Sequence, residues 1–412
     1  MAVGVDGPAE RFFDVNGVRL RVLEAGPAGG PLVVLTHGFP ELAYSWRHQI
    51  PALAAAGYHV LAPDQRGYGG SSRPERVEDY DIAALTGDVA GLLDAVGAER
   101  AAVIGHDFGA VVAWNMALLH PDRVAMVAGL AHPPVPRPLT PPTEAFRRIF
   151  GDNFFYILYF QEPGPADAEL AHDPARTMRL MLGGMRPPAD EAAAMRMLAA
   201  GTAGFLDRLA EPDRLPDWLS AGELEHYVTE FTRTGFTGPL NWYRCFDRNW
   251  RILGEPAADT ITVPALFVGG TDDPTLSFTR TDRAREVVTG SYRQVLLDGA
   301  VDRDLAGGDA ERLHQAHRVD ARAGRGAGAG EGEADDALAV EAEAVEGLER
   351  DEQGEGGVEA ARDADDHVLE ARVADAAGEA RRLDCEDFLA VLVAAVRIVG
   401  RPGSWDSRTE RR

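Results

Sequence analysis

The fold of this chain is decided by the segment Val103-Ile104-Gly105-His106-Asp107-Phe108-Gly109-Ala110. The apolar run that begins at Ala101 is typical of a buried strand, and the apolar run from Val111 to Leu119 is typical of a helix. The motif Gly-x-Asp-x-Gly between them predicts a nucleophile elbow that carries a carboxylate where serine is better known. Its glycines allow a turn tight enough to push the Asp107 side chain out over the sheet edge. Because a helix amino end favours negative charge, we expect Asp107 to stay ionised and to attack carbon.

Strands and helices alternate along the first half of the chain. Asn16-Gly17 separates two short strand-like segments, which is a strong hairpin signal. Apolar stretches further along predict buried strands with helices between them, at 31–36, 58–63, 101–104 and 124–130. This alternation predicts an α/β fold with a mainly parallel, doubly wound sheet that is covered on both faces.

The regular alternation stops near His132, where a proline-rich stretch begins, and a helical section then continues to about Trp250. Strand-like stretches return at 262–270 and 294–297. The tail is rich in Gly, Ala, Asp, Glu and Arg and poor in aromatic residues, a composition typical of disorder. We therefore predict a core (10–132), an inserted helical cap or lid (133–250), a second core part (251–300) and a disordered acidic tail (301–412).

Composition restricts the classes of partner. The formal net charge of −25 at pH 7 argues against nucleic acid and anionic membranes, because both require a basic surface. The 2 cysteines offer no disulfide framework, and no signal-peptide pattern opens the sequence, so we expect a cytoplasmic protein. No apolar run is long enough to predict a membrane span.

The loop His37-Gly38-Phe39-Pro40 follows the first buried parallel strand. In an elbow arrangement, a loop at this place supplies one backbone N–H of an oxyanion hole, and the residue after the nucleophile supplies the other. The candidate donors are therefore the amides of Phe39 and Phe108.

Several longer motifs, spaced through about residues 10 to 300, resemble those of soluble epoxide hydrolases of the α/β-hydrolase superfamily. The resemblance implies the α/β-hydrolase fold and the hydrolysis of epoxides to vicinal diols. A small-molecule epoxide and water would be the reactants, and neither a metal nor another cofactor would be needed. The motifs that carry it are His37-Gly38-Phe39-Pro40-Glu41, Trp46-Arg47-His48-Gln49, the run from Asp64 to Pro74, Gly105 to Gly109, Tyr159 to Gly164, and Gly238 to Arg244.

The resemblance also implies roles for individual residues. Asp107 would attack an epoxide carbon and form an alkyl-enzyme ester. Tyr156 and Tyr243 match the two lid tyrosines of the family, whose phenols would bind the epoxide oxygen and donate a proton as the ring opens. Tyr159 is the competitor for the place of Tyr156.

The third member of the implied triad is Asp273, in Gly270-Thr271-Asp272-Asp273-Pro274, just past a predicted strand. Its carboxylate would orient a histidine and stabilise its charged form. Asp272 is the competing carboxylate, and the register of the motif favours Asp273.

The family pattern fails at the histidine that activates water to hydrolyse the ester. Asp302 stands where the resemblance implies histidine. His314 and His317 lie further on at a different spacing, and we expect both to face solvent. His106 should point away from the nucleophile, and His37 belongs to the oxyanion loop. The chain therefore has no catalytic histidine at the expected position.

Two explanations of this break stay open. One is a change of reading frame near codon 301, since a GC-rich gene read out of frame produces the composition of the tail. The other is a genuine acidic extension on a diverged and catalytically impaired protein. In either case, we expect Asp107 to open epoxides and its ester to persist.

Two rival functions remain. A haloalkane or haloacid dehalogenase uses a similar aspartate ester but needs halide donors, often tryptophan or asparagine. The pair Tyr156 and Tyr243 weighs against this alternative. A non-catalytic ligand-binding α/β-hydrolase homologue would explain the absent histidine and the long acidic tail.

Overall fold

The computed structural model describes residues 7–183, 191–254, 260–273, 276, 279, 281–298 and 300. The tail 301–412 and the residues Asp302, His314 and His317 lie outside the described residues. Among the described residues, no helix is both long enough and apolar enough to cross a bilayer.

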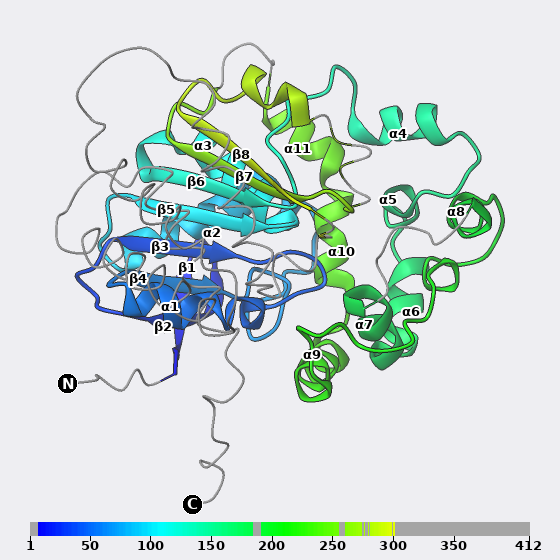
Figure 1. Ribbon diagram of the computed structural model, residues 1–412, viewed down its shortest axis with the longest axis horizontal. Helices are drawn as coiled ribbons and strands as arrows, with labels where there is room; N and C mark the ends of the chain where they lie inside the picture. The colour runs from blue at the N-terminus through cyan, green and yellow to red at the C-terminus, as the bar shows by residue number, and fades with distance from the viewer. Residues whose placement is uncertain are drawn as a thin grey trace, which may run out of the picture.

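The described residues form an eight-stranded sheet (Figure 1). Its strands are β1 (Ala9–Val15), β2 (Val18–Ala25), β3 (Leu32–Thr36), β4 (His59–Pro63), β5 (Ala101–His106), β6 (Val124–Leu130), β7 (Ala265–Gly270) and β8 (Tyr292–Leu297). They lie in the order β1-β2-β4-β3-β5-β6-β7-β8. The pairs β1–β2 and β2–β4 are antiparallel, and all pairs from β4 to β8 are parallel. The predicted α/β fold with a mainly parallel sheet is confirmed.

The predicted hairpin at Asn16-Gly17 joins β1 to β2. Both turn residues have positive φ angles, 46° and 75°, which a two-residue hairpin turn of this kind requires. The turn fixes the register, with Val15 opposite Val18.

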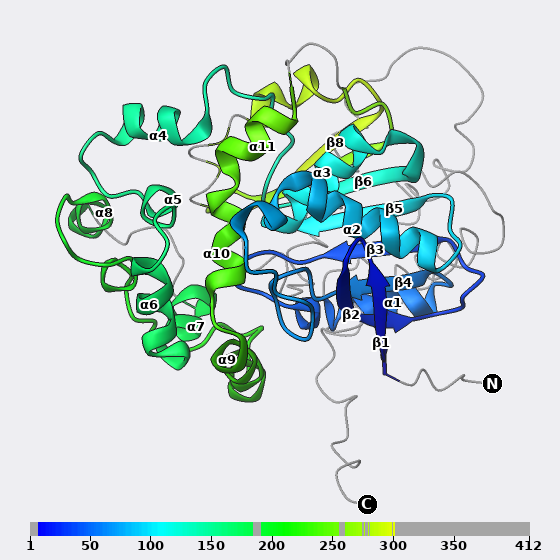
Figure 2. The same cartoon turned by 180° about the vertical axis from the view of Figure 1, so that it is seen from behind.

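Both faces of the central strands are covered. Alternate residues of a strand point to opposite faces, so Val34 joins one buried cluster while Val33 and Leu35 join the other. The helices of the core are α1 (Gln49–Ala55), α2 (Ile82–Ala95) and α3 (Phe108–Leu119), with short 3-10 turns η1 (Ala43–Trp46), η2 (Val77–Tyr80), η3 (Pro121–Arg123) and η6 (Thr281–Glu286). Figure 2 shows α2 and α3 in front of the sheet.

Several element boundaries differ from the sequence prediction, and β7 begins at Ala265 rather than at residue 262. The helix after the elbow begins at Phe108, earlier than Val111, because the strained residue Asp107 is itself the N-cap. The last strand begins at Tyr292, since Tyr292 and Arg293 pair with β7.

A helical insertion lies between β6 and β7. It comprises α4 (Pro142–Phe150), α5 (Tyr156–Tyr159), α6 (Pro165–His172), α7 (Pro174–Gly183), α8 (Glu191–Leu198), η4 (Leu206–Arg208), α9 (Ala221–Thr234), α10 (Thr237–Arg244) and α11 (Phe246–Ile252). Most of these helices gather at one end of the sheet (Figure 1). We call this insertion the cap; its predicted limits, 133–250, stay a prediction.

The cap contacts the core through backbone as well as side chains. A β-carbon on Gly238, in α10, would lie 2.7 Å from the α-carbon of Gly67 in the loop after β4. The indole of Trp242 donates a hydrogen bond to the Arg66 carbonyl at 3.2 Å. These contacts hold α10 against the loop that follows β4.

Candidate active site

Asp107 occupies a strained turn between β5 and α3. Its φ and ψ angles are 53° and −120°, a conformation that non-glycine residues rarely adopt. A β-carbon on Gly105 would lie 2.0 Å from the Gly109 carbonyl oxygen, and one on Gly109 would lie 2.0 Å from the Thr36 carbonyl oxygen. The glycines of the motif are therefore required by close backbone approach, and the packing around them maintains the strain at Asp107.

The loop after β3 closes directly onto the Asp107 carboxylate. The amide of Phe39 donates a hydrogen bond to Asp107 Oδ1 at 2.8 Å. A β-carbon on Gly38 would lie 2.5 Å from the same oxygen, so only glycine permits this approach. The predicted oxyanion loop and the predicted nucleophile are thus in direct contact, and Phe108 follows Asp107 as the first residue of α3.

Tyr243 lies over both predicted oxyanion residues. Its ring centroid is 5.3 Å from that of Phe39 and 4.7 Å from that of Phe108, with edge-to-face geometry in each case. The Tyr156 ring, from α5, lies 6.1 Å from the Tyr243 ring. The structure therefore brings these two phenols, which we call the lid tyrosines, together on the side of the sheet that carries Asp107.

Tyr159 has a different environment. Burial and a hydrogen bond to Glu169 raise the pKa of the Tyr159 phenol. The Glu169 carboxylate also accepts hydrogen bonds from the amides of Phe205 and Leu206, at 3.0 and 2.8 Å. Tyr159 is thus tied to a structural carboxylate inside the cap, whereas Tyr156 contacts Tyr243.

The two carboxylates after β7 differ in burial. Asp273 has a relative exposure of 4%, and its amide donates to the Gly270 carbonyl at 3.2 Å. Asp272 is exposed, and its carboxylate lies 3.3 Å from the Thr271 hydroxyl. Strand β6 lies between β5 and β7, so Asp273 is two strands away from the nucleophile at the same edge of the sheet.

The histidine of the oxyanion loop has a structural role. The His37 ring is fully buried, and burial lowers its pKa. Its Nε2 accepts a hydrogen bond from the Gln65 amide at 3.0 Å, and its Nδ1 lies 2.9 Å from the Gly38 carbonyl oxygen. Because both ring nitrogens are engaged, His37 stabilises the loop in its neutral form.

Epoxide hydrolases match this chain in sequence and in fold. A family model described as alpha/beta hydrolase fold matches residues 31–281. Epoxide hydrolase A of Mycobacterium tuberculosis is 70% identical over 293 residues, which cover 71% of this chain and 91% of that protein. The chain belongs to the epoxide hydrolases of the α/β-hydrolase fold.

Solved structures of epoxide hydrolases agree in fold. The crystal structure of epoxide hydrolase A from Mycobacterium thermoresistibile superimposes with a TM-score of 0.72 at 65% identity, covering 77% of this chain and 98% of that one. An epoxide hydrolase from an endophytic Streptomyces has a TM-score of 0.70 at 38% identity, with coverage of 76% and 96%.

Sequence reasoning missed a buried pair behind the nucleophile of this epoxide hydrolase. His106, which precedes Asp107, is fully buried, and its Nδ1 lies 3.1 Å from Glu41 Oε2. The same Glu41 oxygen accepts the Gly38 amide at 3.1 Å. Glu41 therefore links the oxyanion loop to the elbow. The only sequence signal was the presence of Glu41 in the resembling motif.

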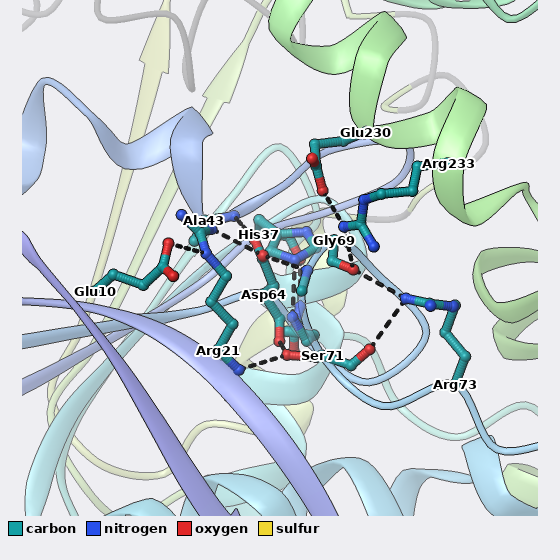
Figure 3. Close-up of polar contacts among 12 residues, drawn as sticks. Glu10, Arg21, His37, Ala43, Asp64, Gly69, Ser71, Arg73, Glu230 and Arg233 are labelled. Atoms are coloured by element: carbon teal, nitrogen blue, oxygen red, sulfur yellow. Dashed lines mark hydrogen bonds and ion pairs between the residues drawn. The ribbon is translucent and has the colours of Figure 1, made fainter.

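Sequence reasoning also missed Asp64, the centre of the polar network in Figure 3. Its two carboxylate oxygens accept hydrogen bonds from the amides of Ala43 and Gly70, at 2.9 and 3.0 Å, and Arg21 pairs with it at 3.0 Å. A β-carbon on Gly69 would lie 2.2 Å from Asp64 Oδ2. This carboxylate orders the loop on which the cap rests.

The loop that contains Gly69 also forms a hydrogen bond with the cap. The Gly69 carbonyl accepts hydrogen bonds from Arg73 in the core and from Arg233 in α9, each at 3.0 Å (Figure 3). A second link joins Arg47 to Glu223 at the start of α9, at 2.6 Å. These two polar links attach α9 of the cap to the core.

Proposed function

We propose that this protein hydrolyses epoxides to vicinal diols through an ester on Asp107. The observation that carries the proposal is the contact of the Tyr243 ring with both Phe39 and Phe108, together with the bond from the Phe39 amide to the Asp107 carboxylate. Ring opening requires a nucleophile at one epoxide carbon and a proton donor at the epoxide oxygen, held together in one site.

In the first half-reaction, a carboxylate oxygen of Asp107 attacks an epoxide carbon, and the bond from that carbon to the ring oxygen breaks. The ring oxygen takes a proton from a lid tyrosine and becomes a hydroxyl group, which leaves a phenolate. A phenol suits this step because it is a neutral donor at pH 7, while its partner phenol holds the oxygen in place. The product is a hydroxyalkyl ester of Asp107.

In the second half-reaction, water attacks the ester carbonyl. The amides of Phe39 and Phe108 are the proposed donors to the negative oxygen that develops, and each such donor contributes about 10²–10³ in rate. Asp273 is the proposed triad acid. Since Asp302 stands at the position where the family resemblance implies the histidine base, we propose that ester hydrolysis is slow and limits turnover.

The reactants proposed for this site are a small-molecule epoxide and water. The net charge of −25 disfavours nucleic acid and anionic membranes as partners. Cys245 is a free, buried thiol, which supports the proposed cytoplasmic location.

The dehalogenase alternative requires side-chain N–H donors that are available to bind halide. Near the lid tyrosines, the indole N–H donor already has a partner in the protein. The Trp242 indole, next to Tyr243, donates to the Arg66 carbonyl. The Trp242 N–H, a donor of the type that binds halide, is thus committed to holding α10 in place.

The test is diol formation from an aryl epoxide such as styrene oxide, measured beside chloride release from a chloroalkane. We expect diol and no chloride, and we expect Asp107→Ala to lose diol formation. The control is Asp213→Ala, because Asp213 is exposed on the cap. Chloride release without diol would favour the dehalogenase, and unchanged ligand binding with no chemistry in any form would favour the non-catalytic homologue.

A further inference from the structure

Gln161 lies just after α5 and bonds to both helices that carry the lid tyrosines. Its side-chain nitrogen donates a hydrogen bond to the Ile157 carbonyl in α5 at 3.0 Å and another to the Tyr243 carbonyl in α10 at 2.9 Å. A carbonyl only accepts, and a carboxamide nitrogen carries two N–H donors, so this one group serves both carbonyls at once. Because Ile157 directly follows Tyr156 in the chain, one side chain joins the backbones that carry the two phenols.

Both bonds satisfy carbonyls at the carboxyl ends of helices. The last turn of a helix leaves carbonyl groups that no amide of the same helix can reach. Helix α5 has only 4 residues, and a single turn is too short to be stable by itself. The placement of α5, and of Tyr156 on it, therefore depends on contacts with neighbouring elements, and Gln161 supplies the contact that leads to α10.

Phe160, the residue before Gln161, packs against both lid tyrosines. Its ring is fully buried, and the ring centroid lies 5.6 Å from that of Tyr156 and 5.1 Å from that of Tyr243. The Phe160 amide donates to the Tyr156 carbonyl at 2.9 Å, which fixes this residue on α5. The separation of the two tyrosine rings is therefore set by one packed ring and by the carboxamide that holds it against α10.

A second link joins the same elements but is less suitable for a test. Arg244 Nε donates to the Phe160 carbonyl at 3.2 Å, and its Nη2 forms an ion pair with Asp167. The Arg244 side chain is buried, and removing it would leave the Asp167 carboxylate without its ion-pair partner, which damages the fold. Gln161 is neutral, so its two bonds can be removed without leaving an unpaired charge.

We propose that Gln161 is a positioning residue for epoxide ring opening, because it sets the distance between the lid tyrosines. This inference rests on the function proposed above. Two phenols can bind one epoxide oxygen only if their hydroxyl groups converge on it, and a misplacement of about 1 Å can reduce a rate by about 10²-fold. Hydrolysis of the ester uses water and the oxyanion donors instead of the phenols, so Gln161 should affect ester formation alone.

The test compares ester formation with ester hydrolysis in the full chain. Gln161→Met keeps the length of the side chain and removes both N–H donors. The unaltered chain and the variant are mixed with styrene oxide, and alkylation of Asp107 is followed by rapid quench and intact-protein mass spectrometry. Decay of the adduct is then followed after the epoxide has been removed. We expect alkylation to slow about 10-fold or more and adduct decay to change less than about threefold.

A double-mutant cycle shows whether Gln161 acts through the lid tyrosines. Gln161→Met is introduced into a chain that already carries Tyr156→Phe and Tyr243→Phe. Since that chain has no lid phenol to position, we expect the added substitution to change its alkylation rate by less than about twofold.

Thr177→Val is the matched control. The buried Thr177 hydroxyl donates to the Leu170 carbonyl at 2.9 Å and joins α7 to α6, neither of which carries a lid tyrosine. This variant also loses a bond from a side chain to a helix carbonyl in the cap, but it should keep the alkylation rate of the unaltered chain. Gln161→Glu, which has the same shape as glutamine, is a second test variant, because its carboxylate would face two carbonyl oxygens. It should slow alkylation at least as much as Gln161→Met.

Several results would overturn the inference. Alkylation of Gln161→Met at the rate of the unaltered chain shows that Gln161 positions nothing. Equal slowing of alkylation and adduct decay shows a structural role only. A loss of undiminished size in the chain without lid phenols shows that Gln161 acts through another group. The proposed function fails separately, and this inference with it, if the unaltered chain forms no adduct or if loss of both phenols leaves its alkylation rate unchanged.

Discussion

The Phe39 amide donates a hydrogen bond to the Asp107 carboxylate, and the residue before Phe39 must be glycine for the two to approach this closely. The β-carbon of an alanine at position 38 would lie 2.4 Å from the Asp107 β-carbon. The loop after β3 and the elbow after β5 therefore pack in direct contact, although 68 residues separate Phe39 from Asp107.

Gly38→Ala should therefore displace the oxyanion loop. Loss of one oxyanion donor costs about 10²–10³ in rate, so we expect kcat for diol formation to fall by about 10²-fold or more. Gly222→Ala is the control, because a β-carbon there meets nothing within 4 Å in α9. It should raise the free energy of unfolding by about 0.5–1 kcal/mol and leave the kinetics unchanged. Equal activity of Gly38→Ala and the unaltered chain would contradict the proposed role of Phe39.

The lid tyrosines should act as a pair. We expect Tyr156→Phe and Tyr243→Phe each to slow alkylation by about 10-fold or more, and the double variant to reduce it about 10²–10⁴-fold, because the leaving oxygen then has no acid. Tyr159→Phe is the matched control, since Tyr159 is bonded to Glu169 inside the cap. Single-turnover alkylation rates provide the measurement. A Tyr159→Phe defect larger than that of Tyr156→Phe would reverse the assignment.

Glu41→Gln tests the buried pair behind the nucleophile. The variant keeps an acceptor for the Gly38 amide but removes the charge beside His106. We expect the free energy of unfolding to fall by about 1–3 kcal/mol, the usual cost of a damaged buried polar pair, and alkylation to slow. Glu144→Gln is the control, since Glu144 pairs with Arg148 on the exposed face of α4. Chemical denaturation should show a change of at most about 1 kcal/mol there.

The link between Arg47 and Glu223 predicts how cap attachment depends on pH. Burial opposes ionisation of Glu223, but hydrogen bonds with Ser220 and the charge of Arg47 outweigh it and hold the pKa of Glu223 below its ordinary value. A carboxylate with a lowered pKa stabilises the folded state above its unfolded pKa, and this contribution disappears as the pH falls through the folded pKa.

Glu223→Gln should therefore weaken the protein at pH 7 and flatten the acid side of its stability profile below about pH 4. Glu225→Gln, on the exposed face of the same helix, should leave that profile unchanged. Thermal unfolding of the three proteins between pH 3 and about pH 7 provides the comparison. Parallel profiles for both variants would show that Glu223 contributes nothing to cap attachment.

Much of the fold was predictable because its signals are local. The Asn16-Gly17 turn determines the register of β1 and β2 through its own positive φ angles. The Gly-x-Asp-x-Gly motif predicted the elbow, since both glycines act within a few residues of Asp107 or on the adjacent strand. The sequence predicted a start of α3 that is too late, because apolar periodicity does not identify the capping residue.

The arrangement around the site required the tertiary structure. Spacing in the sequence could not separate Tyr156 from Tyr159, and it is the packing of α5 against α10 that turns one ring toward Tyr243 and leaves the other with Glu169. Burial likewise distinguishes Asp273 from Asp272.

The amino-acid sequence by itself determined the α/β fold, the elbow and the chemical class of its nucleophile, since these follow from neighbouring residues and their periodicity. Only the tertiary structure decided that Glu41 pairs with His106 and that the Gln161 side chain bonds to the Tyr243 carbonyl. The physical reason is that these contacts join segments far apart in the chain, so no local pattern encodes their geometry.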